Sequence, residues 1–257
     1  MKLAVVGEGR SETTPIGTRG EPLRIAVSGK GGAGKSLVSG ILARVLARQH
    51  RVLVVDLDVL PGVALSLGRP GGSPVVRGVA PFERLLERLT EPAPDGVRLL
   101  PAATYASRGK VGPVLTTLAA FAGASHRLAR GRPLARWSIV GDLPAGPRPT
   151  AYRQYIAYAD VLLVIAEPTV QSILTAQRVL RMSRSRPELA VRVVANKVAD
   201  EEDAELLERE LGEPIFATIP FDEEVRAAER CGEALVDRAP DSPAVVAVEE
   251  IVAALRA

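Results

Sequence analysis

The chain has 257 residues, of which 33 are basic and 30 acidic, so its formal net charge is +3 and its isoelectric point is near 9.2. This balance allows an anionic partner without requiring one, and the single cysteine, Cys231, excludes an internal disulfide framework and fits a reducing compartment. Residues 1–20 lack the pattern of a secretory signal, and no stretch reaches the roughly 20 apolar residues of a membrane span. We therefore expect a soluble, cytoplasmic protein.

Short apolar runs rich in β-branched residues alternate along the chain with segments of helical spacing. The runs predict strands at residues 23–27, 51–55, 97–100, 137–140, 161–166, 191–195 and 214–218. Helices are predicted at residues 35–49, 80–89, 150–159, 170–182, 201–211 and 242–257. This alternation predicts an α/β fold with a doubly wound, mainly parallel sheet of seven or eight strands, flanked by helices.

We expect one domain over residues 23–257, preceded by an N-terminal arm or extra edge strand over residues 1–22. Residues 2–10 echo the segment around residues 24–32, but Glu8 stands where the later copy has Lys30, so no second nucleotide site is predicted. Residues 61–79 are rich in Gly and Pro and are predicted to be loop.

The segment between the first predicted strand and the first predicted helix carries a phosphate-binding pattern. It reads Gly29-Lys30-Gly31-Gly32-Ala33-Gly34-Lys35-Ser36 and matches G-x-x-x-x-G-K-[ST] in the strand–loop–helix context that this motif requires. Glycine-rich backbone can aim its N–H groups at a polyphosphate, and the helix that follows adds its positive end. We therefore predict that residues 29–37, from Gly29 to Leu37, contact the nucleotide, with Lys35 on the β- and γ-phosphates and Ser36 on Mg²⁺.

A second lysine, Lys30, lies early in the same loop. In this respect the loop resembles the deviant Walker A motif of the MinD/ParA family of ATPases. The resemblance implies ATP as ligand, slow hydrolysis to ADP and phosphate, and a homodimer of ATP-bound subunits in which Lys30 reaches the partner's nucleotide.

Two later strands end in carboxylates. Asp56 and Asp58 follow the strand at 51–55 at alternate positions, so their side chains leave it on the same face. By resemblance this segment is switch I, in which Asp58 orients the attacking water and Asp56 supports Mg²⁺. Asp142, after the strand at 137–140, is then the Walker B carboxylate on Mg²⁺, and Gly146 the hinge of switch II.

Two predicted strand ends could meet the base. Asn196 precedes Lys197, and an Asn side chain has the donor and acceptor that suit an adenine edge. In the resembling family this Asn contacts adenine, and a segment like Ile219–Asp222 lies along the base, which implies a base contact for Asn196 and Pro220.

The C-terminal third is similar to the CooC-type ATPases that insert nickel into carbon monoxide dehydrogenase, in segments that include Glu167-Pro168 and Ala234–Asp237. That similarity implies an accessory role in metallocentre maturation. Those proteins carry a Cys-x-Cys pair, whereas this chain has Cys231 alone, so nickel binding would need two copies of Cys231 in a dimer.

Two other roles stay open. One is a MinD- or ParA-like positioning or partition ATPase. Its membrane version is disfavoured because residues 248–257 hold one basic residue, while its DNA-binding version could use the arginines of residues 126–136. The other is a regulatory ATPase whose nucleotide state controls attachment to a client or activator protein.

Overall fold

The computed structural model describes residues 21–58, 62–68, 89–101, 136–146, 152–153 and 155–257. Residues 152, 153 and 155 of the helix predicted at 150–159 are helical. Most of the predicted arm, most of the helix predicted at 80–89 and residues 150, 151 and 154 lie outside the described residues. So does the arginine-rich stretch 126–136, apart from Arg136.

An eight-stranded sheet forms the centre of the molecule, with the strand order β3-β4-β2-β5-β1-β6-β7-β8. All neighbouring strands are parallel except the β3–β4 pair. The strands are β1 Arg24–Gly29, β2 Arg51–Asp56, β3 Glu91–Pro92, β4 Arg98–Pro101, β5 Trp137–Asp142, β6 Val161–Ala166, β7 Ala190–Val198 and β8 Ile215–Pro220. Because β1 lies between β5 and β6, the connections diverge at its carboxyl end, which is where open α/β sheets bind ligands.

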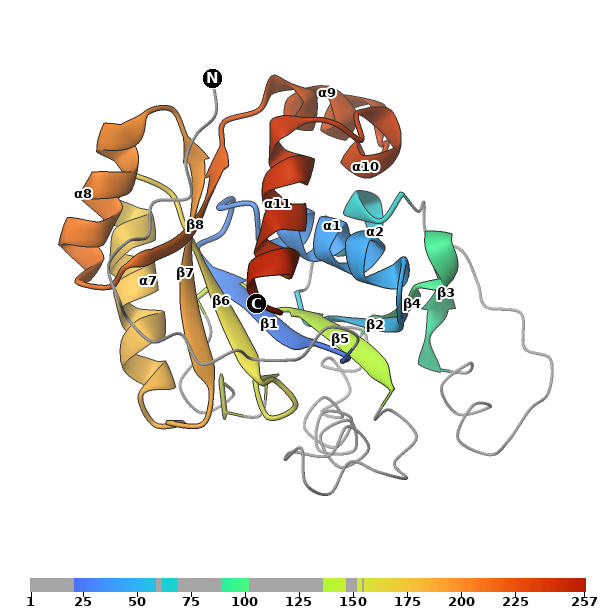
Figure 1. Ribbon diagram of the computed structural model, residues 1–257, viewed down its shortest axis with the longest axis horizontal. Coiled ribbons are helices and arrows are strands. Elements are labelled where there is room, and N and C mark those ends of the chain that lie inside the picture. Colours follow the sequence, from blue (N-terminus) through green and yellow to red (C-terminus); the bar gives the residue numbers. More distant parts are fainter. Residues whose placement is uncertain (1–20, 59–61, 69–88, 102–135, 147–151, 154) are drawn as a thin grey trace.

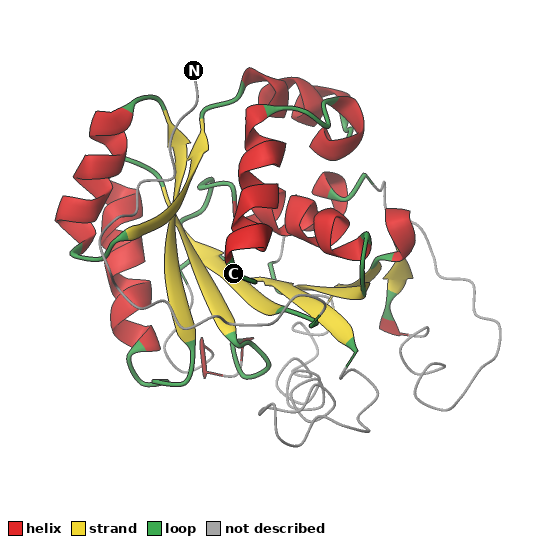
Figure 2. Ribbon diagram, in the orientation of Figure 1, coloured by secondary structure: helices red, strands yellow, loops and turns green. Residues whose placement is uncertain are grey.

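Helices cover both faces of the sheet (Figures 1 and 2). The helix α1 (Lys35–Ala47) and the last helix, α11 (Pro243–Ala254), lie on one face, together with the short α2 (Gly62–Ser66) and with α9 (Glu223–Cys231) and α10 (Leu235–Arg238). On the other face are α7 (Val170–Ser183) and α8 (Glu201–Leu211), and a 3-10 helix, η1 (Pro94–Gly96), connects β3 to β4. No helix in the described part of the chain is both long and apolar enough to cross a membrane.

The alternation of side chains along each strand builds two cores. In β6, Val161, Leu163 and Ile165 pack with α1 and α11, whereas Leu162, Val164 and Ala166 pack with α7 and α8. All six are fully buried, as expected for a parallel strand covered on both faces.

The predicted fold class is confirmed. The strand predicted at 161–166 and the helix predicted at 201–211 have the observed bounds, and the other elements within the described residues agree to within a few residues. One prediction is wrong, because residues 62–66 of the expected loop form α2. The structure also contains four elements that were not predicted, β3, η1, α9 and α10.

Local capping explains where most helices begin. Side-chain oxygens at the N-caps of α7, α8, α9 and α11 accept backbone N–H hydrogen bonds; these residues are Thr169, Asp200, Asp222 and Ser242. The helix α1 differs, because its N-cap is Gly34, which offers no side chain. The first amides of α1 are thus left for another acceptor.

Candidate functional site

The loop from Gly29 to Ser36 joins β1 to α1 and needs glycine at specific places. Gly29 has φ 154°, and a Cβ there would collide with the backbone carbonyl oxygen of Ile165 on β6. Gly34 has φ 89°, and a Cβ there would collide with the side chain of Asn196. A side chain at either position would push the loop away from the edge of the sheet. Glycine is therefore required at both positions by close packing as well as by the positive φ angle.

Lys35 is the first residue of α1, and its side chain turns back toward the loop. The residue is only 5% exposed, and its Nζ donates a hydrogen bond to the carbonyl oxygen of Lys30 at 3.1 Å. The ammonium group therefore lies inside the ring of loop backbone, where a bound phosphate would meet it. No hydrogen bond or ion pair is formed by the side chain of Lys30 within the described residues, and it is only half-buried.

The carboxylate of Asp142 joins the loop to the sheet. Ser36 Oγ donates to its Oδ2 at 2.6 Å and Ser39 Oγ donates to its Oδ1 at 3.2 Å. Asp142 is fully buried, and its desolvation raises its pKa to about 6, although the Ser36 hydrogen bond and the Lys35 charge favour the ionised form. The serine predicted to hold Mg²⁺ and the predicted Walker B carboxylate are therefore in direct contact.

Asp56 lies beside Asp142, since the two residues are register partners on β2 and β5. Burial and the nearby charge of Asp142 raise the pKa of Asp56 to about 7, while a hydrogen bond of 3.1 Å from the backbone N–H of Asp58 favours its charged form. Asp58 itself is less buried and lines the cavity described below. The structure thus brings Ser36, Asp56, Asp58 and Asp142 to one place.

The Asn196-Lys197 pair holds the loop from the β7 side. Asn196 Nδ2 donates to the carbonyl oxygen of Ala33 at 2.7 Å, and Lys197 Nζ donates to that of Gly32 at 2.7 Å. Lys197 also forms an ion pair with Glu167 at the end of β6. Lys197 has φ 59°, beside a register shift between β7 and β8, and this backbone geometry lets two successive side chains reach the same loop.

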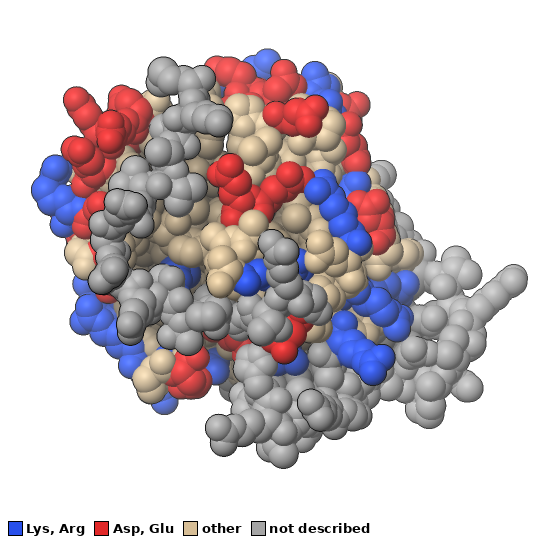
Figure 3. Space-filling model, viewed as in Figure 1, with Lys and Arg blue, Asp and Glu red and all other residues tan. Residues whose placement is uncertain are grey.

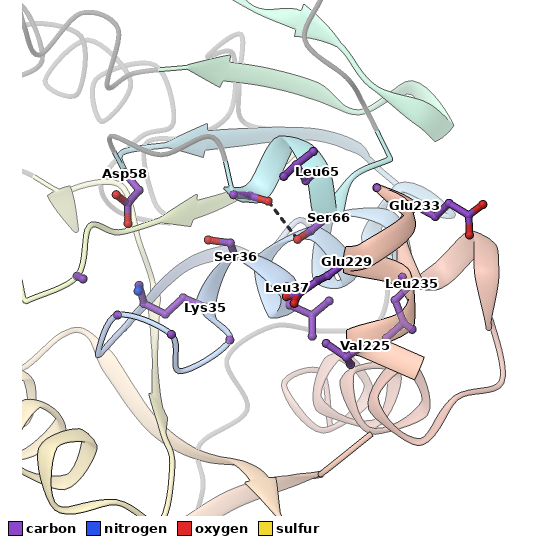
Figure 4. Close-up of a pocket in the computed structure, with 17 residues that line it drawn as sticks. Lys35, Ser36, Leu37, Asp58, Leu65, Ser66, Val225, Glu229, Glu233 and Leu235 are labelled. Atoms are coloured by element: carbon purple, nitrogen blue, oxygen red, sulfur yellow. Dashed lines mark hydrogen bonds between the residues drawn. The ribbon is translucent and has the colours of Figure 1, made fainter. Parts of the chain in front are cut away.

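A cavity of about 540 Å³ opens beside the loop, which is within the usual range for a small-molecule site. One wall consists of loop and α1 residues, and another of α2 residues (Figure 4). The loop and α1 residues are Gly31, Gly32, Gly34, Lys35, Ser36 and Leu37. The α9–α10 segment closes the remaining side with Val225, Ala228, Glu229, Gly232, Glu233 and Leu235. The cavity therefore combines a phosphate-binding end with an apolar end.

Of the predicted site residues, seven line this cavity: Gly31, Gly32, Gly34, Lys35, Ser36, Leu37 and Asp58. The two predicted base contacts do not line it. Asn196 is 3% exposed and bound to the loop, and Pro220 ends β8 opposite Val198. A direct contact of either residue with the base stays a prediction. The α9 wall was not predicted, although Asp222 and Gly232 bracket residues 223–231 as an N-cap and a left-handed C-cap.

The donor groups at this edge of the sheet fit a magnesium nucleotide. The loop offers backbone N–H groups and the uncapped end of α1, and Ser36, Asp56 and Asp142 offer only oxygen, which is what Mg²⁺ prefers. Within the described residues, no three His, Cys, Asp or Glu side chains are grouped so that they could hold a metal by themselves. A Mg²⁺ ion here would need the phosphates as further ligands.

The family model of the CobQ/CobB/MinD/ParA nucleotide-binding domain (CbiA) matches residues 25–236. The chain belongs to this family. The match spans the loop, both predicted switches and the α9 wall, so the whole cavity lies within the nucleotide-binding domain.

Several known proteins resemble the chain over most of its length. An uncharacterized ATP-binding protein of Methanocaldococcus jannaschii is 29% identical over 89% of this chain and 85% of its own. The carbon monoxide dehydrogenase accessory protein CooC of Rhodospirillum rubrum is 26% identical over 85% of this chain and 91% of its own. Among solved structures, the septum site-determining protein MinD of Pyrococcus horikoshii, complexed with Mg-ADP, shares the fold with a TM-score of 0.64, at 23% identity over 91% of this chain and 99% of that one.

Proposed function

We propose that this protein is a molecular switch that binds and hydrolyses ATP and dimerises in its ATP-bound form. The observation that carries the proposal is the hydrogen bond of 2.6 Å between Ser36 and Asp142, because it joins the phosphate loop to the carboxylate that ends a neighbouring strand. In this arrangement a change at the γ-phosphate is transmitted directly to the segment after β5.

The side chains of the loop have separable tasks in this mechanism. Lys35, which now donates to the carbonyl oxygen of Lys30, would bind the β- and γ-phosphates, and Ser36 and Asp142 would hold Mg²⁺ with support from Asp56. Bound Mg²⁺ supplies charge neutralisation of the phosphates. Asp58, which lines the cavity, orients the attacking water.

Dimerisation follows from the second lysine. Lys30 is half-buried at the rim of the loop and its side chain makes no ion pair within the described part of the chain, so it can extend to the nucleotide of a second subunit. Gly146 has φ 58° after the exposed Ala145, and Ala145 faces Gly31. We infer that this turn relaxes after hydrolysis and separates the subunits.

Three substitutions test the mechanism by size-exclusion chromatography with ATP and by ATP-binding calorimetry. Lys35→Ala should abolish nucleotide binding, Asp58→Ala should give a long-lived ATP dimer, and Lys30→Ala should bind ATP but stay monomeric. Normal ATP-dependent dimerisation of Lys30→Ala would rule out the cross-subunit role.

For the biological role we propose that the protein is an accessory ATPase that acts on a client protein, most specifically in metallocentre maturation. The similarity to CooC supports this role, and Cys231 is exposed at the end of α9, where two copies could meet in a dimer. The positioning and regulatory roles remain the competing candidates.

Titration of nickel into the Asp58→Ala ATP dimer separates these roles. One nickel per dimer, lost in Cys231→Ser, is the result expected for metallocentre maturation. Absence of nickel binding would leave the ATP switch intact and move the assignment to a positioning or regulatory ATPase.

A further inference from the structure

Arg44 joins two walls of the cavity, although it does not line the cavity itself. It lies in the last turn of α1 and is 8% exposed. Its Nη1 donates hydrogen bonds to the carbonyl oxygen of Leu67, just after α2, at 3.2 Å and to Asp237 Oδ2 on α10 at 3.1 Å. Its Nη2 donates to Asp237 Oδ1 at 2.6 Å, so the guanidinium group holds both oxygens of that carboxylate.

A second carboxylate binds the same guanidinium group but belongs to no wall of the cavity. Arg44 Nε donates to Asp95 Oδ2 at 2.5 Å, and Asp95 lies in η1, between β3 and β4. The side chains of Asp95 and Asp237 are almost equally exposed, at 50% and 51%. The two ion pairs are therefore closely matched, except that only the one with Asp237 ends on a cavity wall.

The end of α2 and the helix α10 approach each other closely beside Arg44. Gly68 has φ 85°, and a Cβ there would lie 3.1 Å from Asp237 Oδ2 and 3.2 Å from the Cβ of Ala234. Leu65 lines the cavity on the α2 side and Leu235 lines it on the α10 side (Figure 4). A shift of α10 relative to α2 would therefore change the space between these two walls.

Neither α2 nor α10 can hold its position by itself. The two helices have five and four residues, and helices of this length are not stable without tertiary contacts. Both pack on α1, which carries Arg44. A planar guanidinium group that binds both oxygens of a carboxylate fixes the orientation of its partner as well as its distance. The placement of α10 against the end of α2 therefore depends on this side chain.

We propose that Arg44 is a positioning residue for nucleotide binding, because its contacts with Leu67 and Asp237 set the width of the cavity between α2 and α10. The inference rests on the proposed function, since it requires a nucleotide whose phosphates lie on the loop. The loop end of the cavity contains no residue that Arg44 binds, so only the nucleoside part of the ligand depends on this width.

Calorimetric titration of full-length Asp237→Ala and Asp95→Ala with Mg-ATP and with magnesium tripolyphosphate tests the proposal. Tripolyphosphate has the phosphates without the nucleoside, so its affinity reports on the loop alone. Asp237→Ala releases α10 from Arg44 and should bind ATP about ten-fold more weakly than the wild-type protein, with unchanged affinity for tripolyphosphate. Asp95→Ala should keep both affinities. Asp237→Glu retains two carboxylate oxygens and should restore most of the affinity for ATP.

Urea unfolding of the same variants separates positioning from a general loss of stability. Each alanine variant leaves the buried Arg44 with one carboxylate, which should destabilise the protein. Residue 95 has φ 56°, a conformation that alanine adopts less readily than aspartate, so Asp95→Ala should lose at least as much stability as Asp237→Ala. A weaker binding of ATP in Asp237→Ala alone therefore cannot come from destabilisation.

The outcomes also distinguish this proposal from the proposed function. Wild-type affinity for ATP in Asp237→Ala, or an equal loss of that affinity in Asp95→Ala, would overturn the positioning role and leave the ATP switch standing. A loss of tripolyphosphate affinity as large as that of ATP in Asp237→Ala would overturn it too, because the effect would then lie at the loop. If the wild-type protein bound neither ATP nor tripolyphosphate, the proposed function itself would be wrong.

Discussion

At the scale of single residues, the two buried carboxylates at the ends of β2 and β5 work against folding. Asp56 and Asp142 are neighbours in the sheet, and burial raises the pKa of the first to about 7 and of the second to about 6. Burying two neighbouring carboxyl groups costs folding free energy, so stability alone does not explain their position. Their position makes sense as a cation site, because Mg²⁺ stabilises both in the charged form.

These pKa values predict how stability depends on pH in the absence of Mg²⁺ and nucleotide. A carboxyl whose pKa is raised in the folded state binds its proton more tightly there than in the unfolded chain. Its contribution to stability is therefore present below about pH 4 and is lost as the pH rises toward 7. Asp56→Asn removes this loss, so it should raise the free energy of unfolding at pH 8 by about 2 kcal/mol and have little effect near pH 4.

Urea unfolding of the wild-type protein and of Asp56→Asn at both pH values measures this difference. Asp241→Asn, at an exposed position, is the control and should follow the wild-type curve. A gain for Asp56→Asn that is the same at pH 4 and pH 8 would show that the effect does not come from ionisation. Added Mg²⁺ should stabilise the wild-type protein more than the variant.

Residue-level prediction was possible where the chemistry is contiguous in the sequence. The loop from Gly29 to Ser36 reads directly as a phosphate-binding motif, and the strand-ending aspartates lie where their strands predict. The contacts from Asn196 and Lys197 to the loop join residues more than 160 positions apart. Only the strand order brings them together, so the sequence alone did not show that this pair holds the loop.

At the scale of elements, α2 packs closely against α1, and glycines make this approach possible. A Cβ at Gly40 would lie 2.6 Å from the Cβ of Ser66, so α1 and α2 approach closely only because residue 40 is glycine. At the other end of α2, a Cβ at Gly62 would lie 2.9 Å from Ser36 Oγ. The helix that follows Asp58 is thus in contact with the serine that joins loop and sheet.

Gly40→Ala should therefore destabilise the protein although alanine is the better helix former. The propensity gain is about 1 kcal/mol, whereas forcing apart two packed helices costs about 1–3 kcal/mol. We expect a net loss of about 1 kcal/mol in the free energy of unfolding and weaker binding of Mg-ATP, measured by urea unfolding and calorimetry. The Gly40→Ala/Ser66→Gly double variant should recover part of both losses, and a Gly40→Ala protein more stable than wild type would contradict the proposed contact.

Element-level prediction succeeded for long segments and failed for short ones. A helix of about 13 residues, or a buried strand of about six, gives a hydrophobic pattern that can be recognised in the sequence. The five residues of α2, the four of α10 and the two of β3 are too few for that, and tertiary contacts decide their structure. Because α10 forms part of one wall of the cavity, the sequence did not predict that wall.

At the scale of the whole molecule, charge is divided along the chain in a way that the net value of +3 conceals. Residues 200–257 hold 17 of the 30 acidic residues but only 5 of the 33 basic ones. Figure 3 shows acidic side chains gathered over the region of α8, α9 and α10. Polyanions such as nucleic acid are disfavoured on this surface, so a partner that binds here would be expected to be basic.

The last helix completes the core around the first. In α11, Val245, Val248 and Ile251 are fully buried in the core that contains Val38, Leu42 and the rest of the inner face of α1. Arg48 and Glu249 add an ion pair across the two helices. Seven apolar side chains of this helix and its end are buried, and removing α11 loses their burial, at about 1.5–3 kcal/mol each for the larger ones, which approaches the whole stability of a domain.

A chain that ends at Asp241 should therefore fail to fold. We expect it to lack a cooperative thermal transition and to bind no ATP, measured by circular dichroism and calorimetry. A chain that ends at Leu255 keeps all buried residues of α11 and is the control. Cooperative unfolding of the shorter chain would show that α11 is dispensable.

The pairing of α1 with α11 also sets the order of events during synthesis. The phosphate loop leaves the ribosome early, about 200 residues before the helix that must cover the other side of α1. Contacts between segments so far apart in sequence form late. The phosphate loop can thus take its final position only after residues 243–254 have left the ribosome, because until then one side of α1 is uncovered.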